Sequence, residues 1–251
     1  MAVLDYEAAL IEQNQLLGDA IFSADLGTPV PTCPGWTLLQ LMRHVGRGDR
    51  WAAHIINTGG PGDLDPRTVP DGRPPDDLGG ARAWLQASPV TVIKAVGAVG
   101  PDTLASTFLG PRPAAWWIRR RLHEATVHRA DAMLATGERY ELSPELAADG
   151  IEEWLERLTA ELRSADEPAL SDTATISLSA TDISVTWSIA GLPHGIQWSR
   201  SLPGSPAQAR LAGPAADVFL ALVRRRPAGE AGVLLEGDPG TWTQWLNRTP
   251  L

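Results

Sequence analysis

The sequence predicts an α+β protein in which an N-terminal four-helix bundle is followed by a small α+β domain. Apolar residues recur at helical spacing through roughly the first 160 residues, whereas beyond residue 172 they alternate with Ser and Thr at a period of two. Residues 164–172, between these regions, are rich in small and charged side chains, as is typical of a linker. We therefore expect one domain over residues 1–165 and a second over residues 170–251.

Helical segments account for most of the first region. Thr37 is expected to begin the second helix, because Gln40 three residues later completes a capping box, and Gly59 is expected to end that helix. Pro89 lies within the third segment, where a proline disfavours helix. Gly137 ends the fourth segment. The expected helices cover residues 4–24, 37–59, 76–99, 114–136 and 144–163.

The second region begins with a strong hairpin signal. Apolar residues alternate with polar ones over residues 176–180 and 183–189, and Thr181 and Asp182 form a turn between the two runs. We expect these runs to pair as antiparallel strands. Further strands are expected near Ile196 and Trp198 and at residues 209–212 and 233–235, and helices at residues 214–225 and 241–247.

Composition and charge exclude several classes of function. The formal net charge is −9 and dense Lys/Arg runs are missing, which argues against nucleic-acid binding; the run at residues 119–121 is interpreted as a local charge cluster. A leader pattern and an apolar stretch long enough for a membrane span are also missing. The single cysteine, Cys33, rules out an intrachain disulfide. We expect a cytoplasmic monomer or small homo-oligomer that contacts neither nucleic acid nor membrane.

A metal site is predicted from three residues. Glu124 and His128 are four residues apart on the fourth helix, so they project within about 40° of each other and can grip one ion. His44 flanks the apolar face of the second helix and supplies the third ligand if the two faces pack together. Two imidazoles and one carboxylate with an open position suit a catalytic zinc or, alternatively, nickel, iron or another divalent ion. From spacing alone, the Glu/His pair also fits an ordinary surface contact.

The remaining histidines carry weaker signals. His123 lies about 140° from His128 around the helix, so the two do not share an ion, although His123 fits a position behind the ligands. For His54 and His194 the sequence suggests no partner, and both are expected to be surface or packing residues.

Two ordered motifs resemble a known family. VPTCPGWT at residues 30–37, with LMRHVG at residues 41–46 and RWAA at residues 50–53, resembles the N-terminal signature of the mycothiol-dependent maleylpyruvate isomerase family. WWIRRRLHEATVHRAD at residues 116–131 resembles its second signature. The resemblance implies a DinB/YfiT-like metal-binding bundle, and the pattern after residue 170 is similar to the family's sterol-carrier-like C-terminal domain.

The resemblance assigns roles to individual residues. The family's metal ligands fall on His44, Glu124 and His128, the residues that helix geometry selects. The family also uses a substrate-contacting arginine from its C-terminal domain, and Arg225 is favoured here. This chain has Val223 and Arg224 where the family tends to have Trp-Gly, and the arginine run also fits a solvated helix C-terminus.

The implied activity is thiol-dependent chemistry on a small molecule. A divalent ion stabilises a thiolate, so mycothiol adds to the activated double bond of maleylpyruvate, and rotation and loss of the thiol give fumarylpyruvate. Three alternatives stay open: a mycothiol S-transferase, a metal-dependent enzyme that uses no thiol, and a non-catalytic binding or regulatory protein that retains the bundle.

Other residues of the two motifs have less certain roles. Cys33 lies in a Pro/Gly turn for which the sequence suggests no His or Lys neighbour, which argues against a nucleophile. Trp36 and Trp51 fit either the core or a substrate pocket. Asp131 and Arg129 either support the metal ligands or form plain surface pairs.

Overall fold

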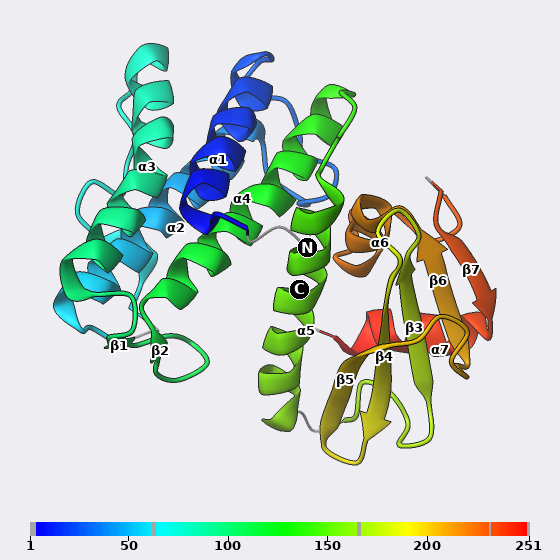
Figure 1. The fold of residues 1–251 in the computed structure, drawn as a ribbon. Coiled ribbons are helices and arrows are strands. Elements are labelled where there is room, and N and C mark those ends of the chain that lie inside the picture. Colours follow the sequence, from blue (N-terminus) through cyan, green and yellow to red (C-terminus); the bar gives the residue numbers. More distant parts are fainter. Residues whose placement is uncertain (1–3, 62–63, 165–166, 231, 250–251) are drawn as a thin grey trace. The chain divides into compact units, whose positions relative to one another are not determined.

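The computed structural model describes residues 4–61, 64–164, 167–230 and 232–249. It confirms the predicted fold class, with helices first and a sheet afterwards (Figure 1). The expected domain limits at residues 1, 165 and 251 lie outside the described residues. Among the residues that are described, no helix is both long and apolar enough to cross a membrane.

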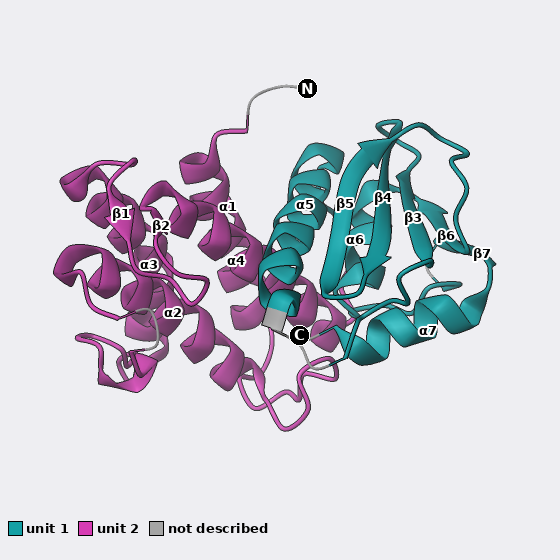
Figure 2. Ribbon diagram, turned by 90° about the horizontal axis from the view of Figure 1, so that it is seen from below, with its two compact units in different colours: residues 1–2, 141–251 teal, residues 3–140 magenta. Residues whose placement is uncertain are grey.

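The chain divides into two compact units, coloured separately in Figure 2. We call residues 3–140 the bundle unit and residues 141–251 the sheet unit. This division differs from the boundary expected near residue 165, because the fifth helix groups with the sheet. Glu152 on that helix accepts hydrogen bonds from Trp187 Nε1 at 2.8 Å and Arg200 Nε at 2.6 Å, both on strands of the sheet.

Four long helices form the bundle unit. Their bounds agree with the sequence prediction to within two residues, and a two-stranded hairpin that was not predicted precedes the last of them. The elements are α1 (Tyr6–Phe22), α2 (Leu38–Thr58), the short 3-10 turn at Pro66–Thr68, α3 (Leu78–Val99), β1 (Leu104–Ala105), β2 (Arg112–Pro113) and α4 (Ala115–Thr136).

Local signals explain where these helices begin and end. The backbone N–H of Thr37 donates to Gln40 Oε1 at 2.7 Å, as expected for the capping box that starts α2. Gly59 and Gly137 end α2 and α4 in the left-handed conformation that favours glycine. Pro89 is accommodated inside α3. Capping therefore fixes both ends of α2 and the C-terminal end of α4, the two helices that carry the predicted metal ligands.

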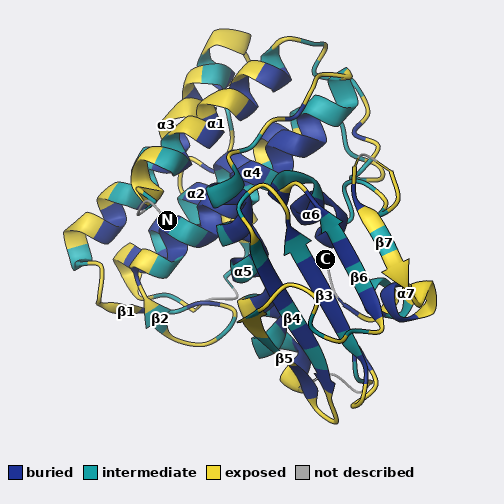
Figure 3. Cartoon of the chain, turned by 45° about the vertical axis from the view of Figure 1, so that its right-hand side comes forward, coloured by how far each residue is buried: buried dark blue, intermediate teal, exposed yellow. Residues whose placement is uncertain are grey.

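One apolar core joins all four helices of the bundle unit. Leu41 and Val45 of α2 and Ala125 of α4 belong to the same buried cluster as Leu17 of α1 and Leu85 of α3. In α4, burial extends around much of the helix and includes charged residues (Figure 3). The helix that carries two of the three predicted ligands is therefore largely buried.

The sheet unit contains a five-stranded sheet of order β5-β4-β3-β6-β7. The predicted hairpin of β3 and β4 is confirmed as an antiparallel pair, whereas β3 and β6 are parallel. The central strands are largely buried and β7 is largely exposed (Figure 3). The elements are α5 (Pro144–Glu161), the 3-10 turn Leu162–Ser164, β3 (Thr175–Ala180), β4 (Val185–Leu192), β5 (Gly195–Ser201), β6 (Ala209–Gly213), α6 (Ala215–Leu222), β7 (Leu234–Gly237) and α7 (Pro239–Arg248).

Candidate metal centre

The structure brings the three predicted ligands together inside the bundle unit. His44 lies on α2, and Glu124 and His128 lie one turn apart on α4. Glu124 Oε2 is 3.3 Å from His44 Nε2 and 3.5 Å from His128 Nε2. The three candidate ligand atoms all lie within 4.8 Å of one another. Residues that are 80 positions apart in the sequence therefore converge on one point.

These spacings fit coordination of a single ion. Zinc binds imidazole nitrogen and carboxylate oxygen at about 2.0–2.1 Å, so two ligand atoms at tetrahedral positions lie about 3.3–3.4 Å apart. The two distances from Glu124 Oε2 are close to that value. The donor set and its spacing therefore fit a small divalent cation.

The centre is buried on the α4 side and open on the α2 side. His128 is 8% exposed, whereas the His44 side chain keeps 41% of its surface exposed. The pKa of His44 is lowered from 6.5 to about 3, first because burial of the ring disfavours its charged form and then because of electrostatic interactions with neighbouring groups, among them the guanidinium groups of Arg121 and Arg120. His44 is therefore neutral near pH 7, the form of imidazole that binds metal.

Arginines hold the carboxylate of Glu124. Arg120 forms an ion pair with Oε1, and Arg121 Nη1 lies 3.7 Å from Oε2. Arg121 is itself fixed, since its Nε donates to Asp49 Oδ1 at 2.7 Å and its Nη2 to the Val45 carbonyl at 3.1 Å. One carboxylate oxygen is thus bound to a guanidinium while the other faces the two imidazoles.

The interpretation of residues 119–121 as a local charge cluster missed this arrangement. Arg120 and Arg121 are only 6% and 4% exposed. The available signal was their spacing, because residues three and four positions before Glu124 lie on the same helix face as Glu124.

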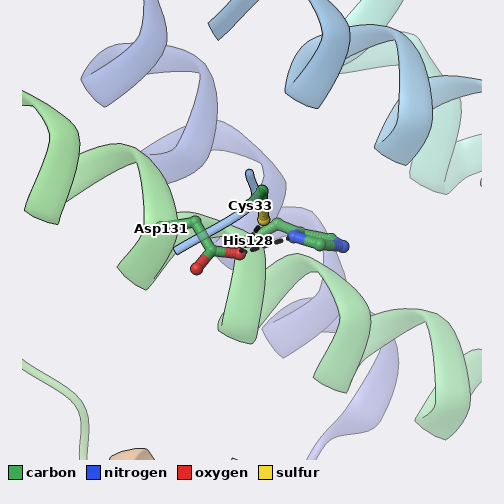
Figure 4. A group of neighbouring side chains, drawn as sticks. All are labelled: Cys33, His128 and Asp131. Carbon is green, nitrogen blue, oxygen red and sulfur yellow. Dashed lines mark hydrogen bonds and ion pairs between the residues drawn. The ribbon is translucent and has the colours of Figure 1, made fainter. Parts of the chain in front are cut away.

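A second carboxylate contacts His128 at Nδ1, the ring nitrogen that is not the candidate ligand atom. Asp131, which is fully buried, accepts a hydrogen bond at Oδ2 from His128 Nδ1 at 2.7 Å (Figure 4). The Cys33 thiol donates to the same oxygen at 3.4 Å, and the Thr32 hydroxyl donates to Oδ1 at 2.5 Å. Asp131 is therefore a buried partner of a predicted ligand, and the surface-pair alternative for it is wrong. The expectation that Cys33 has no histidine near it is also wrong.

Of the two tryptophans that the sequence singled out, one lies beside the two imidazoles. The ring of Trp36 is 5.0 Å from that of His44 and 6.3 Å from that of His128, so Trp36 borders the centre. Trp51 instead packs edge-on against Trp117, and its Nε1 donates to the Leu64 carbonyl at 2.6 Å.

The other predicted functional residues lie elsewhere. Arg129 is buried, with its guanidinium 4.5 Å from the centroid of the Tyr140 ring. His123 is buried, whereas His54 is half-buried and His194 is exposed. None of these three histidines belongs to a group of potential metal ligands found among the described residues.

Arg225 lies in the sheet unit, just after α6. Its Nη1 donates to the Val223 carbonyl at 2.9 Å. The neighbouring arginines have structural partners, because Arg224 Nη2 donates to the Thr249 carbonyl at 2.5 Å and Arg226 lies 3.8 Å from Asp217. The role of Arg225 in substrate binding stays a prediction.

Comparisons with solved structures support the fold. The crystal structure of a mycothiol-dependent maleylpyruvate isomerase matches with a TM-score of 0.58 and 14% sequence identity, over 98% of this chain and 95% of that one. A variant of such an isomerase with one histidine replaced by alanine matches with a TM-score of 0.57 and 15% identity, over the same shares of the two chains. No curated protein sequence matches the chain.

Family models cover most of the chain. Residues 8–133 match the mycothiol maleylpyruvate isomerase N-terminal domain, and residues 145–244 match the C-terminal domain of the same family. The first match contains all three predicted metal ligands, and the second contains Arg225. The chain therefore belongs to the mycothiol-dependent maleylpyruvate isomerase family and is an isomerase-like enzyme.

Proposed function

We propose that this protein is a divalent-metal-dependent enzyme that uses mycothiol to isomerise maleylpyruvate to fumarylpyruvate. The observation that carries the proposal is the position of Glu124 Oε2, which lies 3.3 and 3.5 Å from the Nε2 atoms of two imidazoles. Membership of the family supports the choice of thiol and substrate.

Zinc is the ion that we propose for this centre. His44, Glu124 and His128 would hold the ion with two nitrogens and one oxygen, a set of three protein ligands that is typical of catalytic rather than structural zinc sites. When bound there, a divalent ion would supply a thiolate nucleophile near neutral pH by lowering the pKa of a coordinating thiol.

The proposed reaction needs no oxidant or reductant. The sulfur of mycothiol adds to one carbon of the substrate's double bond, and the π electrons move onto the conjugated carbonyl. Rotation about the resulting single bond follows. The electron pair then returns from the carbonyl oxygen and re-forms the double bond. The carbon–sulfur bond breaks, the thiolate is released, and the product has a trans double bond.

The protein's own residues hold the reactants in this scheme. His44 and His128 act as neutral ligands, and Glu124 contributes one negative charge while Arg120 holds its second oxygen. Trp36 borders both imidazoles and would shield one side of the incoming thiol. We propose Arg225 as the residue that orients a substrate carboxylate through a bidentate contact.

Metal content and thiol binding test the proposal. Purified protein should hold about one equivalent of zinc. In calorimetry, the zinc-bound protein should bind mycothiol and the zinc-free protein should not. His44→Ala, Glu124→Gln and His128→Ala should each lose the ion, mycothiol binding and turnover of maleylpyruvate. His54→Ala, which removes another histidine of α2, should retain all three. Arg225→Ala should keep the ion and raise KM for the anionic substrate.

Three results would change the assignment. Less than about a tenth of an equivalent of metal after reconstitution, with no turnover, would make the protein a binding module that retains the family fold. A product that keeps mycothiol covalently attached would identify an S-transferase. Turnover without any thiol would exclude the thiol-dependent reaction altogether.

A further inference from the structure

We propose that Asp131 is a positioning residue, held by the Thr32 hydroxyl and the Cys33 thiol, that fixes the His128 ring so that Nε2 faces the candidate metal centre. This inference rests on the proposed function, because it assigns a task to residues behind one of the proposed ligands. It assigns to residues 32, 33 and 131 the task of supporting His128.

The contacts of Asp131 support a dedicated role. Its carboxylate is fully buried, an arrangement that is unfavourable unless hydrogen bonds compensate for the lost water. Thr32 Oγ1 donates to Oδ1 at 2.5 Å, and Cys33 Sγ donates to Oδ2 at 3.4 Å. His128 Nδ1 lies 2.7 Å from Oδ2. These three donors reach the carboxylate from two segments of the chain. Figure 4 shows Cys33 and His128 beside Asp131.

The contact with His128 determines which nitrogen is available for an ion. A neutral imidazole carries one proton, and a carboxylate 2.7 Å from Nδ1 places that proton on Nδ1. The lone pair is then on Nε2, the atom that lies 3.5 Å from Glu124 Oε2. A nitrogen lone pair and a carboxylate oxygen repel each other when they face directly, and a cation between them turns this repulsion into attraction. Asp131 thus selects the tautomer that the proposed centre requires.

Cys33, His128 and Asp131 could also be considered as a second group of metal ligands, because their ligand atoms lie within 4.8 Å of one another. The 2.7 Å between His128 Nδ1 and Asp131 Oδ2 argues against this. Two atoms bound to one zinc ion are about 3.3 Å apart, whereas 2.7 Å is a hydrogen-bond distance. We therefore infer support of the first centre rather than a second ion.

The turn that carries Thr32 and Cys33 is well fixed. The backbone N–H of Val30 donates to the Trp36 carbonyl at 2.9 Å, and the N–H of Cys33 donates to the Val30 carbonyl at 3.0 Å. Trp36, at the end of the same turn, packs beside the ring of His44. One turn thus contacts Asp131 with two side chains and the ring of His44 with a third.

Two measurements on the full-length protein test the role of Asp131. In metal-free wild type, ¹⁵N NMR of the histidine side chains should show His128 with its proton on Nδ1, and Asp131→Asn should lose that preference. Zinc affinity, measured by competition with a chromophoric chelator, should fall about 10- to 100-fold in Asp131→Asn.

The Thr32 variants form a matched pair that leaves Asp131 in place. Thr32→Val removes the hydroxyl at nearly constant shape and should weaken zinc binding several-fold. Thr32→Ser keeps the hydroxyl and should restore most of the affinity. Circular dichroism and thermal unfolding of each variant establish that it is folded.

The outcomes separate this inference from the proposed function. If wild type binds one equivalent of zinc and Asp131→Asn binds it equally tightly, or if His128 carries its proton on Nε2, the positioning role is wrong while the metal centre stands. If wild type binds no zinc, both proposals fall. Equal losses in Thr32→Ser and Thr32→Val would also contradict the role of the hydroxyl.

Discussion

Gly48 on α2 leaves room for Arg121, which contacts Asp49 and Glu124 beside the candidate metal centre. A Cβ atom added at Gly48 would lie 2.5 Å from Arg121 Nη2 and 2.7 Å from its Cζ. An arginine is usually flexible, but this guanidinium is only 5% exposed and is bound to the buried carboxylate of Asp49 and to the Val45 carbonyl. The side chain therefore has to give up buried hydrogen bonds before it can move.

Gly48→Ala should consequently destabilise the protein by about 1–3 kcal/mol, the usual cost of overpacking a buried site, despite the better helix propensity of alanine. Gly97→Ala on α3 is the matched control, since a Cβ there meets no atom within 4 Å. It should stabilise by about 0.5–1 kcal/mol. Urea unfolding of both variants measures the difference. Equal effects of the two substitutions would mean that Arg121 moves aside freely.

Part of the candidate site was predictable at this scale. The spacing of Glu124 and His128 follows from one helix, so the sequence predicts that they project together. His44 was expected beside them because it flanks an apolar stripe, and its Nε2 lies 3.3 Å from Glu124 Oε2. The burial of Asp131 and Arg121 was not predictable, because it depends on contacts with residues 98 and 72 positions away in the sequence. Pattern analysis along one helix cannot supply such partners.

Helix α3 accommodates a proline, Pro89, in its interior. Pro89 has no N–H to offer the Leu85 carbonyl four residues earlier. The hydroxyl of Ser88 lies 2.8 Å from that carbonyl and 2.6 Å from Asp49 Oδ2, so it can serve either acceptor. Both Ser88 and Asp49 are fully buried. The serine thus compensates for the proline and also contacts the carboxylate that holds Arg121.

Ser88→Ala should therefore destabilise the protein by about 1–3 kcal/mol, because it leaves buried acceptors without a donor. Pro89→Ala restores a backbone N–H for the Leu85 carbonyl, so the cost of Ser88→Ala should be smaller in that background, although the contact with Asp49 is still lost. A double-mutant cycle by urea denaturation measures this coupling. Strictly additive effects would show that the hydroxyl does not substitute for the missing N–H.

Most elements were predictable because their periods and caps are local. The helices of the bundle unit end within two residues of their expected positions, and the hairpin of β3 and β4 follows from alternation around a turn. The parallel pairing of β3 with β6 was not predictable, because it joins residues separated by more than one element. The grouping of α5 with the sheet depends on Glu152 and its partners on two strands. Hydrophobic periodicity does not reveal such contacts.

At the scale of the whole molecule, the proposed metal ligands all belong to one of the two units. His44, Glu124 and His128, together with Asp131 and the turn at residues 30–36, all lie within the bundle unit. Among the residues that the structure describes, the sheet unit contributes none to the candidate metal groups. An ion that binds only folded protein stabilises the part that holds its ligands, by RT ln(1 + [L]/Kd) for one site, or about 2.7 kcal/mol at a hundred times Kd.

Zinc should therefore act on the two units unequally. Each unit has its own buried core, so heating the full-length protein in a calorimeter should resolve two unfolding transitions. Zinc should raise the midpoint temperature only of the transition that belongs to the bundle unit. With ΔΔG near 2.7 kcal/mol and roughly 140 residues in that unit, the expected rise is on the order of 5–10 °C. His128→Ala should abolish the rise, whereas His54→Ala should preserve it. A single transition that moves as a whole would mean that the units unfold together, and a rise confined to the sheet unit would place the ion outside the site built by α2 and α4.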